Sequence, residues 1–146
     1  MRAVVQRVDG TTVSVAGEVV GELSGTGLCV LLGVKHGDTV ASADAMAQKL
    51  WNLRILADDE GRMNRSCAEL SAPLLVISQF TLYGDTSRGR RPSFVEALPG
   101  PQAEPLVERV VETLRALGAE VSTGRFGAHM MVRLTNDGPV TLVVET

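Results

Sequence analysis

Histidine and cysteine are scarce in this chain, because its 146 residues contain only two of each. The histidines, His36 and His129, are far apart, and there is no CxxC, HxxxH or other close set of these residues. Zinc sites use such sets, so the sequence predicts neither a metal site nor a cofactor. GxSxG, GxxxxGKS/T and a helix-opening GxGxxG are also missing, which argues against nucleophile-elbow hydrolases, P-loop proteins and dinucleotide-binding proteins.

An excess of charge and long apolar runs are lacking as well. The formal net charge is −3, so the chain has no overall attraction for nucleic acid, and such a partner must be held locally. No apolar run approaches the roughly 20 residues of a membrane helix. Because the N-terminal MRAVVQRVDG does not resemble a signal peptide, we expect a soluble, cytoplasmic protein. The length predicts one domain over residues 1–146.

The apolar pattern that is present predicts a fold rich in β-structure. Residues 3–23 alternate β-branched positions with turn signals at Asp9-Gly10 and Gly17-Glu18, which predicts a small antiparallel meander. Two apolar runs, 27–34 and 74–83, predict buried strands, and helical spacing predicts helices over 38–53 and 98–118. We expect an α/β fold, with mixed and antiparallel sheets forming a barrel-like core and with two main helices.

Polar residues interrupt the second buried run near its end. In LLVISQFTLY the apolar pattern gives way to Ser78, Gln79 and Thr81. Strand alternation predicts Gln79 and Thr81 on one face, with Ser78, Phe80 and Leu82 on the other. Strand ends of this kind commonly present ligand groups, although polar residues at a sheet edge can also be satisfied by neighbouring backbone.

Three arginines cluster in the segment SRGRRPSF. Arg88, Arg90 and Arg91 stand beside glycine, in a segment predicted to be a loop that could reach phosphate groups. The alternative interpretation is an ordinary solvated loop, because exposed charges need no ligand.

A proline stands in a turn near the C-terminus that does not need one. The stretch TNDGPVT, residues 135–141, separates MMVRL from VTLVVE, and we predict a hairpin that joins these two strands. Asn-Asp-Gly alone would suffice to turn the chain. Pro139 after Gly138 adds rigidity and allows a cis peptide bond at low cost.

These motifs, taken in order, resemble the D-aminoacyl-tRNA deacylase family, of the D-Tyr-tRNA deacylase type. The resemblance rests on MRAVVQRV, GRMNRS, SQFTLYGD, GRRPSF, GRFGAHMMV and NDGPVT, and it covers almost the whole chain. It implies an enzyme that hydrolyses the ester joining a D-amino acid, or glycine mischarged on tRNA-Ala, to the terminal adenosine of tRNA. In the motif Ser78–Thr81, the backbone N–H groups of Phe80 and Thr81 would form an oxyanion hole. The ribose 2′-hydroxyl would then help to activate water, whereas an older view makes the Thr81 hydroxyl the nucleophile.

The resemblance also implies a homodimer with composite active sites. The pair Gly138-Pro139 would be cis, would enter the active site of the partner subunit and would reject L-amino acids sterically. Arg7 would brace this pair, and Phe126 would be a contact for the adenine base. Arg88, Arg90 and Arg91 are the candidate contacts to the rest of the tRNA.

Two other functions stay open from the sequence. One is a non-catalytic RNA-binding module, which would bind tRNA without loss of the ester. The other is a small hydrolase that uses the hydroxyl of Thr81 or Ser78 as a conventional nucleophile on another acyl compound.

Overall fold

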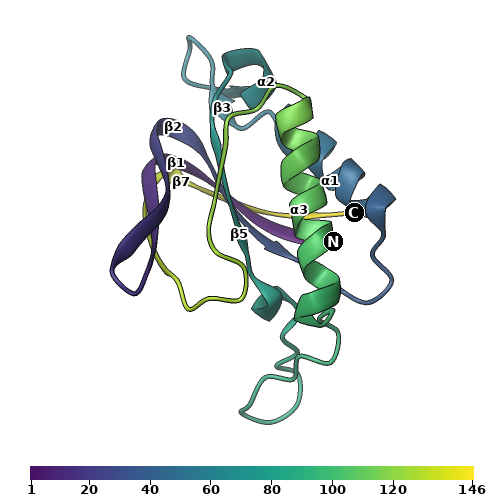
Figure 1. Cartoon of the computed structure of the whole chain (residues 1–146). Helices are drawn as coiled ribbons and strands as arrows, with labels where there is room; N and C mark the ends of the chain where they lie inside the picture. The colour runs from purple at the N-terminus through teal and green to yellow at the C-terminus, as the bar shows by residue number, and fades with distance from the viewer.

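The computed structural model describes all residues from 1 to 146. A five-stranded sheet with the order β6-β5-β2-β1-β7 is covered on one face by helices α1 and α3 (Figure 1). The strands are β1 (Arg2–Val15), β2 (Glu18–Gly33), β5 (Leu74–Ser78), β6 (Val121–Thr123) and β7 (Met131–Glu145), and a separate hairpin consists of β3 (Leu56–Ala57) and β4 (Met63–Arg65). The helices are α1 (Val40–Asn52), α2 (Cys67–Leu70), α3 (Gly100–Ala116) and the 3₁₀ helix η1 (Phe80–Tyr83).

The N-terminal half of the sheet is one long hairpin rather than the predicted meander. Strand β1 runs straight through Asp9-Gly10, where a register shift marks a bulge and Gly10 has φ of 82°. The chain reverses only at Ala16-Gly17, whose φ values of 51° and 87° match a two-residue turn with both φ angles positive. The predicted turn at Asp9-Gly10 is therefore wrong, because a bulge absorbs the same residue types within a continuous strand.

The predicted C-terminal hairpin is also wrong. Strand β7 does not reverse at TNDGPVT, because both of its halves pair antiparallel with the same strand β1. Asn136 lies opposite Val8 and Thr141 lies opposite Gln6, so residues 137–140 bulge out of the ladder between two paired segments. Proline is tolerated at this position because it has no backbone N–H, and a residue in a bulge makes no ladder hydrogen bond that would require one.

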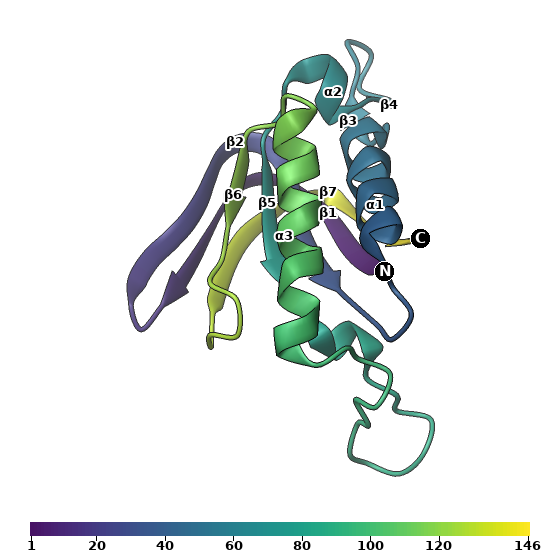
Figure 2. The same cartoon turned by 45° about the vertical axis from the view of Figure 1, so that its right-hand side comes forward.

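The sheet is mixed, which confirms the α/β class, but the expected barrel-like core is not confirmed. Strands β1, β2 and β7 pair antiparallel, whereas β2, β5 and β6 pair parallel. The sheet stays open, with β6 and β7 as its edges. The far end of the β1–β2 hairpin nevertheless bends towards β6 (Figure 2). At Gly21 in β2, a Cβ atom would lie 2.3 Å from the carbonyl oxygen of Thr123.

The two main helices are those predicted, with shifted starts. Helix α1 is capped by Thr39, which exchanges hydrogen bonds with Ser42 in a capping box. Asp38, where the predicted helix begins, instead accepts a hydrogen bond of 2.7 Å from the ammonium group of Met1. Helix α3 begins at Gly100, so Pro105 lies inside the helix and not in its first turn. None of the helices is both long and apolar enough to cross a bilayer.

Both faces of the sheet are apolar because residues alternate along β2 and β5. Leu28, Val30 and Leu32 belong to the larger core, which has 25 buried residues and includes the buried faces of α1 and α3. Cys29 and Ile77, on the opposite face, belong to a second core of six buried residues. The carboxyl end of β5 is thereby held between two packed layers, and this end carries the candidate site.

Candidate active site

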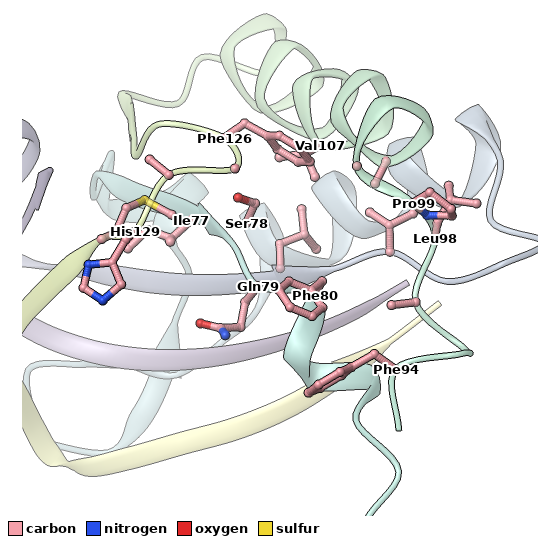
Figure 3. Close-up of a pocket in the computed structure, with 18 of the residues that line it drawn as sticks. Ile77, Ser78, Gln79, Phe80, Phe94, Leu98, Pro99, Val107, Phe126 and His129 are labelled. Atoms are coloured by element: carbon pink, nitrogen blue, oxygen red, sulfur yellow. The ribbon is translucent and has the colours of Figure 1, made fainter. Parts of the chain in front are cut away.

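A cleft of about 640 Å³ opens at the carboxyl end of β5. It is bounded by the start of α3 and by the loop that follows β6 (Figure 3). Ser78, Gln79 and Phe80 line it, as do Phe126 and His129 from the loop. In the view of Figure 3, Phe126 and Phe80 lie on opposite sides of Ser78. The structure therefore brings together three residues of the SQFT motif and the predicted aromatic contact.

The SQFT motif does not continue the strand as predicted. Strand β5 ends at Ser78, and Phe80–Tyr83 form η1. The predicted alternation of side chains from Gln79 onward is therefore wrong. The reason lies in the neighbouring strand, because β2 ends at Gly33 and its last pairing with β5 joins Leu32 to Ser78.

The first turn of η1 carries free backbone donors. Phe80 and Thr81 are its first two residues, so their N–H groups have no acceptor within the helix. Gln79 occupies the N-cap position but makes no capping hydrogen bond. Its side-chain amide instead donates to the Thr81 hydroxyl oxygen. Two adjacent donors, one on the cleft-lining Phe80 and one on Thr81 directly after it, are thus left without an acceptor in η1.

Arg2 stabilises η1 through two contacts, and no sequence motif indicated this role for Arg2. Its guanidinium donates a hydrogen bond of 2.8 Å to the carbonyl of Leu82 and lies 4.9 Å from the centre of the Tyr83 ring. Gly33 lies beneath the same turn, where a Cβ atom would be 3.1 Å from the carbonyl oxygen of Gln79. Arg2 is more than seventy positions from the motif in sequence, so no local signal connects them.

No titratable base forms a hydrogen bond with a hydroxyl of the SQFT motif. The Thr81 hydroxyl is exposed and has Gln79 as its hydrogen-bond partner. His129 lines the cleft but forms no hydrogen bond with Thr81 or Ser78. The thiols are remote and protonated, because burial raises the pKa of Cys29 to about 11 and that of Cys67 to about 12. The chain also contains no cluster of three or more metal-ligating side chains.

Gly138 and Pro139 do not line this cleft. They lie in the bulge of β7, their peptide bond is cis, and Gly138 has φ of 139°. Arg7 holds the bulge, because its Nε donates a hydrogen bond of 3.0 Å to the carbonyl of Asp137 while Nη1 donates one of 3.1 Å to the carbonyl of Ile55. From the other side, the Asn136 side chain accepts a hydrogen bond of 2.7 Å from the N–H of Val140. The bulge is thus fixed from both ends.

The arginine cluster lies on an exposed loop next to the cleft. Arg88, Arg90 and Arg91 are all exposed and form no ion pair within the chain. Phe126, by contrast, is partly buried and packs against the larger core while it lines the cleft. Phe94, which the sequence analysis missed, also lines the cleft and contacts Phe80. Its position three residues after Arg91 in GRRPSF is the signal that could have indicated it.

Comparisons with known proteins identify relatives over the full length of the chain. The model of the family described as D-Tyr-tRNA(Tyr) deacylase matches residues 4–145. A D-aminoacyl-tRNA deacylase of Streptomyces coelicolor is 63% identical over 145 residues, which cover 99% of each chain. A protein of the same name from Nocardia farcinica is 61% identical over 148 residues, and the match covers 100% of both chains.

Two solved structures share the fold. One, named c-Myc DNA Unwinding Element Binding Protein, has a TM-score of 0.92 and 39% identity, with 100% of this chain and 99% of that chain covered. The other, described as a probable eukaryotic D-amino acid tRNA deacylase, has a TM-score of 0.86 at 18% identity and covers 99% of this chain and 98% of that one. The family model and the sequence relatives agree in name and in extent, and the chain belongs to the D-Tyr-tRNA(Tyr) deacylase family, a family of hydrolases.

Proposed function

We propose that this protein hydrolyses the ester bond between a D-amino acid and the terminal adenosine of tRNA. The observation that carries the proposal is the start of η1, where the N–H groups of Phe80 and Thr81 have no acceptor within the helix and Phe80 lines the cleft. Such a pair of donors suits the negative charge that develops on the carbonyl oxygen of an ester under attack. An aminoacyl ester is already activated, so this stabilisation together with positioning suffices.

The nucleophile in this proposal is water. The ribose hydroxyl next to the ester orients the water, whose oxygen attacks the carbonyl carbon, and the N–H groups of Phe80 and Thr81 hold the resulting oxyanion. The bond between the acyl carbon and the ribose oxygen then breaks, and this oxygen takes up the proton that the attacking water loses. Gln79 contributes by donating to the Thr81 hydroxyl, which orients that side chain without deprotonating it.

Rejection of L-amino acids is assigned to Gly138 and Pro139 of a partner subunit. D- and L-substrates carry identical groups, so only a rigid wall can separate them by the position of the side chain. The contacts of Arg7 and Asn136 with the bulge support this rigidity. Glycine has no side chain to reject, so glycine mischarged on tRNA-Ala is also a substrate in this proposal.

A homodimer is part of the same proposal. Gly138 and Pro139 are absent from the cleft of their own subunit, so a selectivity role requires a second copy. Strand β7 forms an edge of the sheet and exposes apolar side chains, with Met131 59% and Val143 65% exposed. A long edge strand with exposed apolar residues favours pairing with another chain. Cytoplasmic location stays a prediction.

Wild-type protein should remove the amino acid from D-Tyr-tRNA and Gly-tRNA but should leave L-Tyr-tRNA intact. A steric wall predicts at least about a 100-fold difference between the D and L rates, because a misplacement of about 1 Å can cost that much. The measurement is loss of labelled amino acid from each tRNA over time. Equal rates for D- and L-Tyr-tRNA would refute the wall. Tight tRNA binding without ester loss would instead favour a non-catalytic RNA-binding module.

Replacing Thr81 with alanine should preserve most of the deacylation, within about fivefold of wild type. The backbone N–H of residue 81 is retained in this variant, and the hydroxyl has no base to activate it. Single-turnover rates with D-Tyr-tRNA measure the effect, and a Ser78→Ala variant tests the other hydroxyl of the motif in the same way. A loss of several orders of magnitude in a folded Thr81→Ala protein would establish the hydroxyl as the nucleophile.

A further inference from the structure

Two aromatic side chains form an exposed pair at the edge of the cleft. Phe80 is 57% exposed and Phe94 is 38% exposed. Their ring centroids lie 5.1 Å apart at an interplanar angle of 71°, an edge-to-face arrangement. Both rings line the cleft, and Figure 3 shows Phe94 on the far side of Phe80 from Ser78. Large aromatic rings left this open to solvent beside a site need an explanation.

The arginine loop, residues 85–93, ends directly before Phe94 of this aromatic pair. Two hydrogen bonds, of 2.8 and 2.9 Å, join the backbones of Asp85 and Ser93 and close the loop at its base. Phe94 follows this bridge directly and packs against the backbone of Gly84, where a Cβ atom would lie 2.9 Å from Cε1 of the ring. The ring of Phe94 is therefore held in place at the root of the loop although it is partly exposed.

The loop itself is cationic and projects from the body of the protein (Figure 1). Arg88, Arg90 and Arg91 contribute three positive charges to a chain whose net charge is −3. Asp85, the acidic residue at the base of the loop, is engaged by the N–H of Ser87 at 2.8 Å and does not pair with them. An aromatic platform beside unpaired arginines is the arrangement that binds single-stranded nucleic acid by base stacking and by phosphate contacts.

We propose that the Phe80–Phe94 pair and the arginine loop bind the single-stranded 3′ end of the tRNA just outside the cleft. Phe94 stacks on a base that precedes the terminal adenosine, and Arg88, Arg90 and Arg91 contact the adjoining phosphates. This inference rests on the proposed function, since the cleft then holds the aminoacyl-adenosine and the next nucleotides must leave past Phe80. It explains how an acidic protein holds tRNA, because the attraction is concentrated in one loop.

Comparing a full and a minimal substrate tests this surface. D-Tyr-tRNA carries the preceding nucleotides and phosphates, whereas D-tyrosyl-adenosine fills the cleft alone. Phe94→Leu should lower the ratio of kcat/KM for tRNA to kcat/KM for the adenosine ester by about tenfold, which is within the range for loss of one base–aromatic stack. Replacing Arg88, Arg90 and Arg91 together by glutamine should lower the same ratio and flatten the dependence of KM for tRNA on salt concentration.

Val95→Ala is the matched control, because Val95 is the neighbour of Phe94 in sequence, is 80% exposed and does not line the cleft. This variant should keep both activities and their ratio. The proposal is overturned if Phe94→Leu and the arginine variant leave the ratio unchanged, whether both activities fall together or neither falls. If the wild-type protein cleaves neither ester, the proposed function is refuted, and the inference that rests on it is refuted as well. Activity on the adenosine ester also verifies that each variant is folded.

Discussion

Replacing Gly138 with alanine should lower the rate of D-Tyr-tRNA deacylation by about 100-fold, the loss expected when a positioning element moves by about 1 Å. Gly138 has φ of 139°, a conformation that residues with a Cβ atom rarely adopt. The added Cβ atom would lie 2.7 Å from Cγ2 of Val140 and 2.9 Å from the Val140 nitrogen. The backbone of the bulge must therefore shift, and the proposed selectivity wall shifts with it.

Single-turnover rates with D- and L-Tyr-tRNA would measure this effect. Gly17→Ala is the matched control, because Gly17 also has positive φ, at 87°, but a Cβ atom there would meet nothing within 4 Å. Alanine in the control is strained by a positive φ in the same way, but in the β1–β2 turn, and this variant should keep its activity. A Gly138→Ala enzyme with the wild-type rate and wild-type selectivity would show that the bulge of β7 has no part in catalysis.

Replacing Gly21 with alanine should lower the free energy of unfolding by about 2 to 3 kcal/mol, as forced overpacking does. A Cβ atom at Gly21 would lie 2.3 Å from the carbonyl oxygen of Thr123 and 3.1 Å from its carbonyl carbon. The obstacle is backbone of strand β6, which is anchored by its pairing with β5 and cannot rotate away. The close approach of the bent β1–β2 hairpin to β6 would then be lost.

Thermal unfolding would show this as a fall in Tm of about 5 to 10 °C, at roughly 2 to 4 °C per kcal/mol for a domain of this size. Gly100→Ala serves as the control, since a Cβ atom there would be at an ordinary distance of 3.7 Å from Cε1 of Phe126. Its Tm should stay close to that of the wild type. An unchanged Tm for Gly21→Ala would mean that β2 and β6 do not approach each other this closely.

The helices were predictable because their signals are local. The apolar residues of α1 and α3 recur at helical spacing, so residues that end on one face are already near in sequence. Capping was less predictable. Asp38 and Thr39 are both residue types that favour the N-cap position. Thr39 is the cap in the structure, because Asp38 binds the ammonium group of Met1, which is distant in sequence.

The strands were predictable as apolar runs but not in their connections. Asp9-Gly10 and the stretch TNDGPVT carry the residue types of turns, yet both lie within continuous strands. A turn and a bulge use the same conformational freedom of glycine, and only the partner strand distinguishes them. Strand β1 pairs with both halves of β7, and this pairing decides that the chain does not reverse at Gly138.

The candidate site was likewise predictable from the sequence only in part. The sequence by itself determined the composition of the site, since the break in the apolar pattern marked Ser78, Gln79 and Thr81, and the ordered motifs indicated the family. Only the tertiary structure decided that η1 begins at Phe80, because β5 loses its partner where β2 ends at Gly33. It also decided that Phe94 lies against Phe80 and that Gly138 lies outside its own cleft. Residue type is a local property, whereas free donors, neighbours and access depend on strand pairings between distant segments.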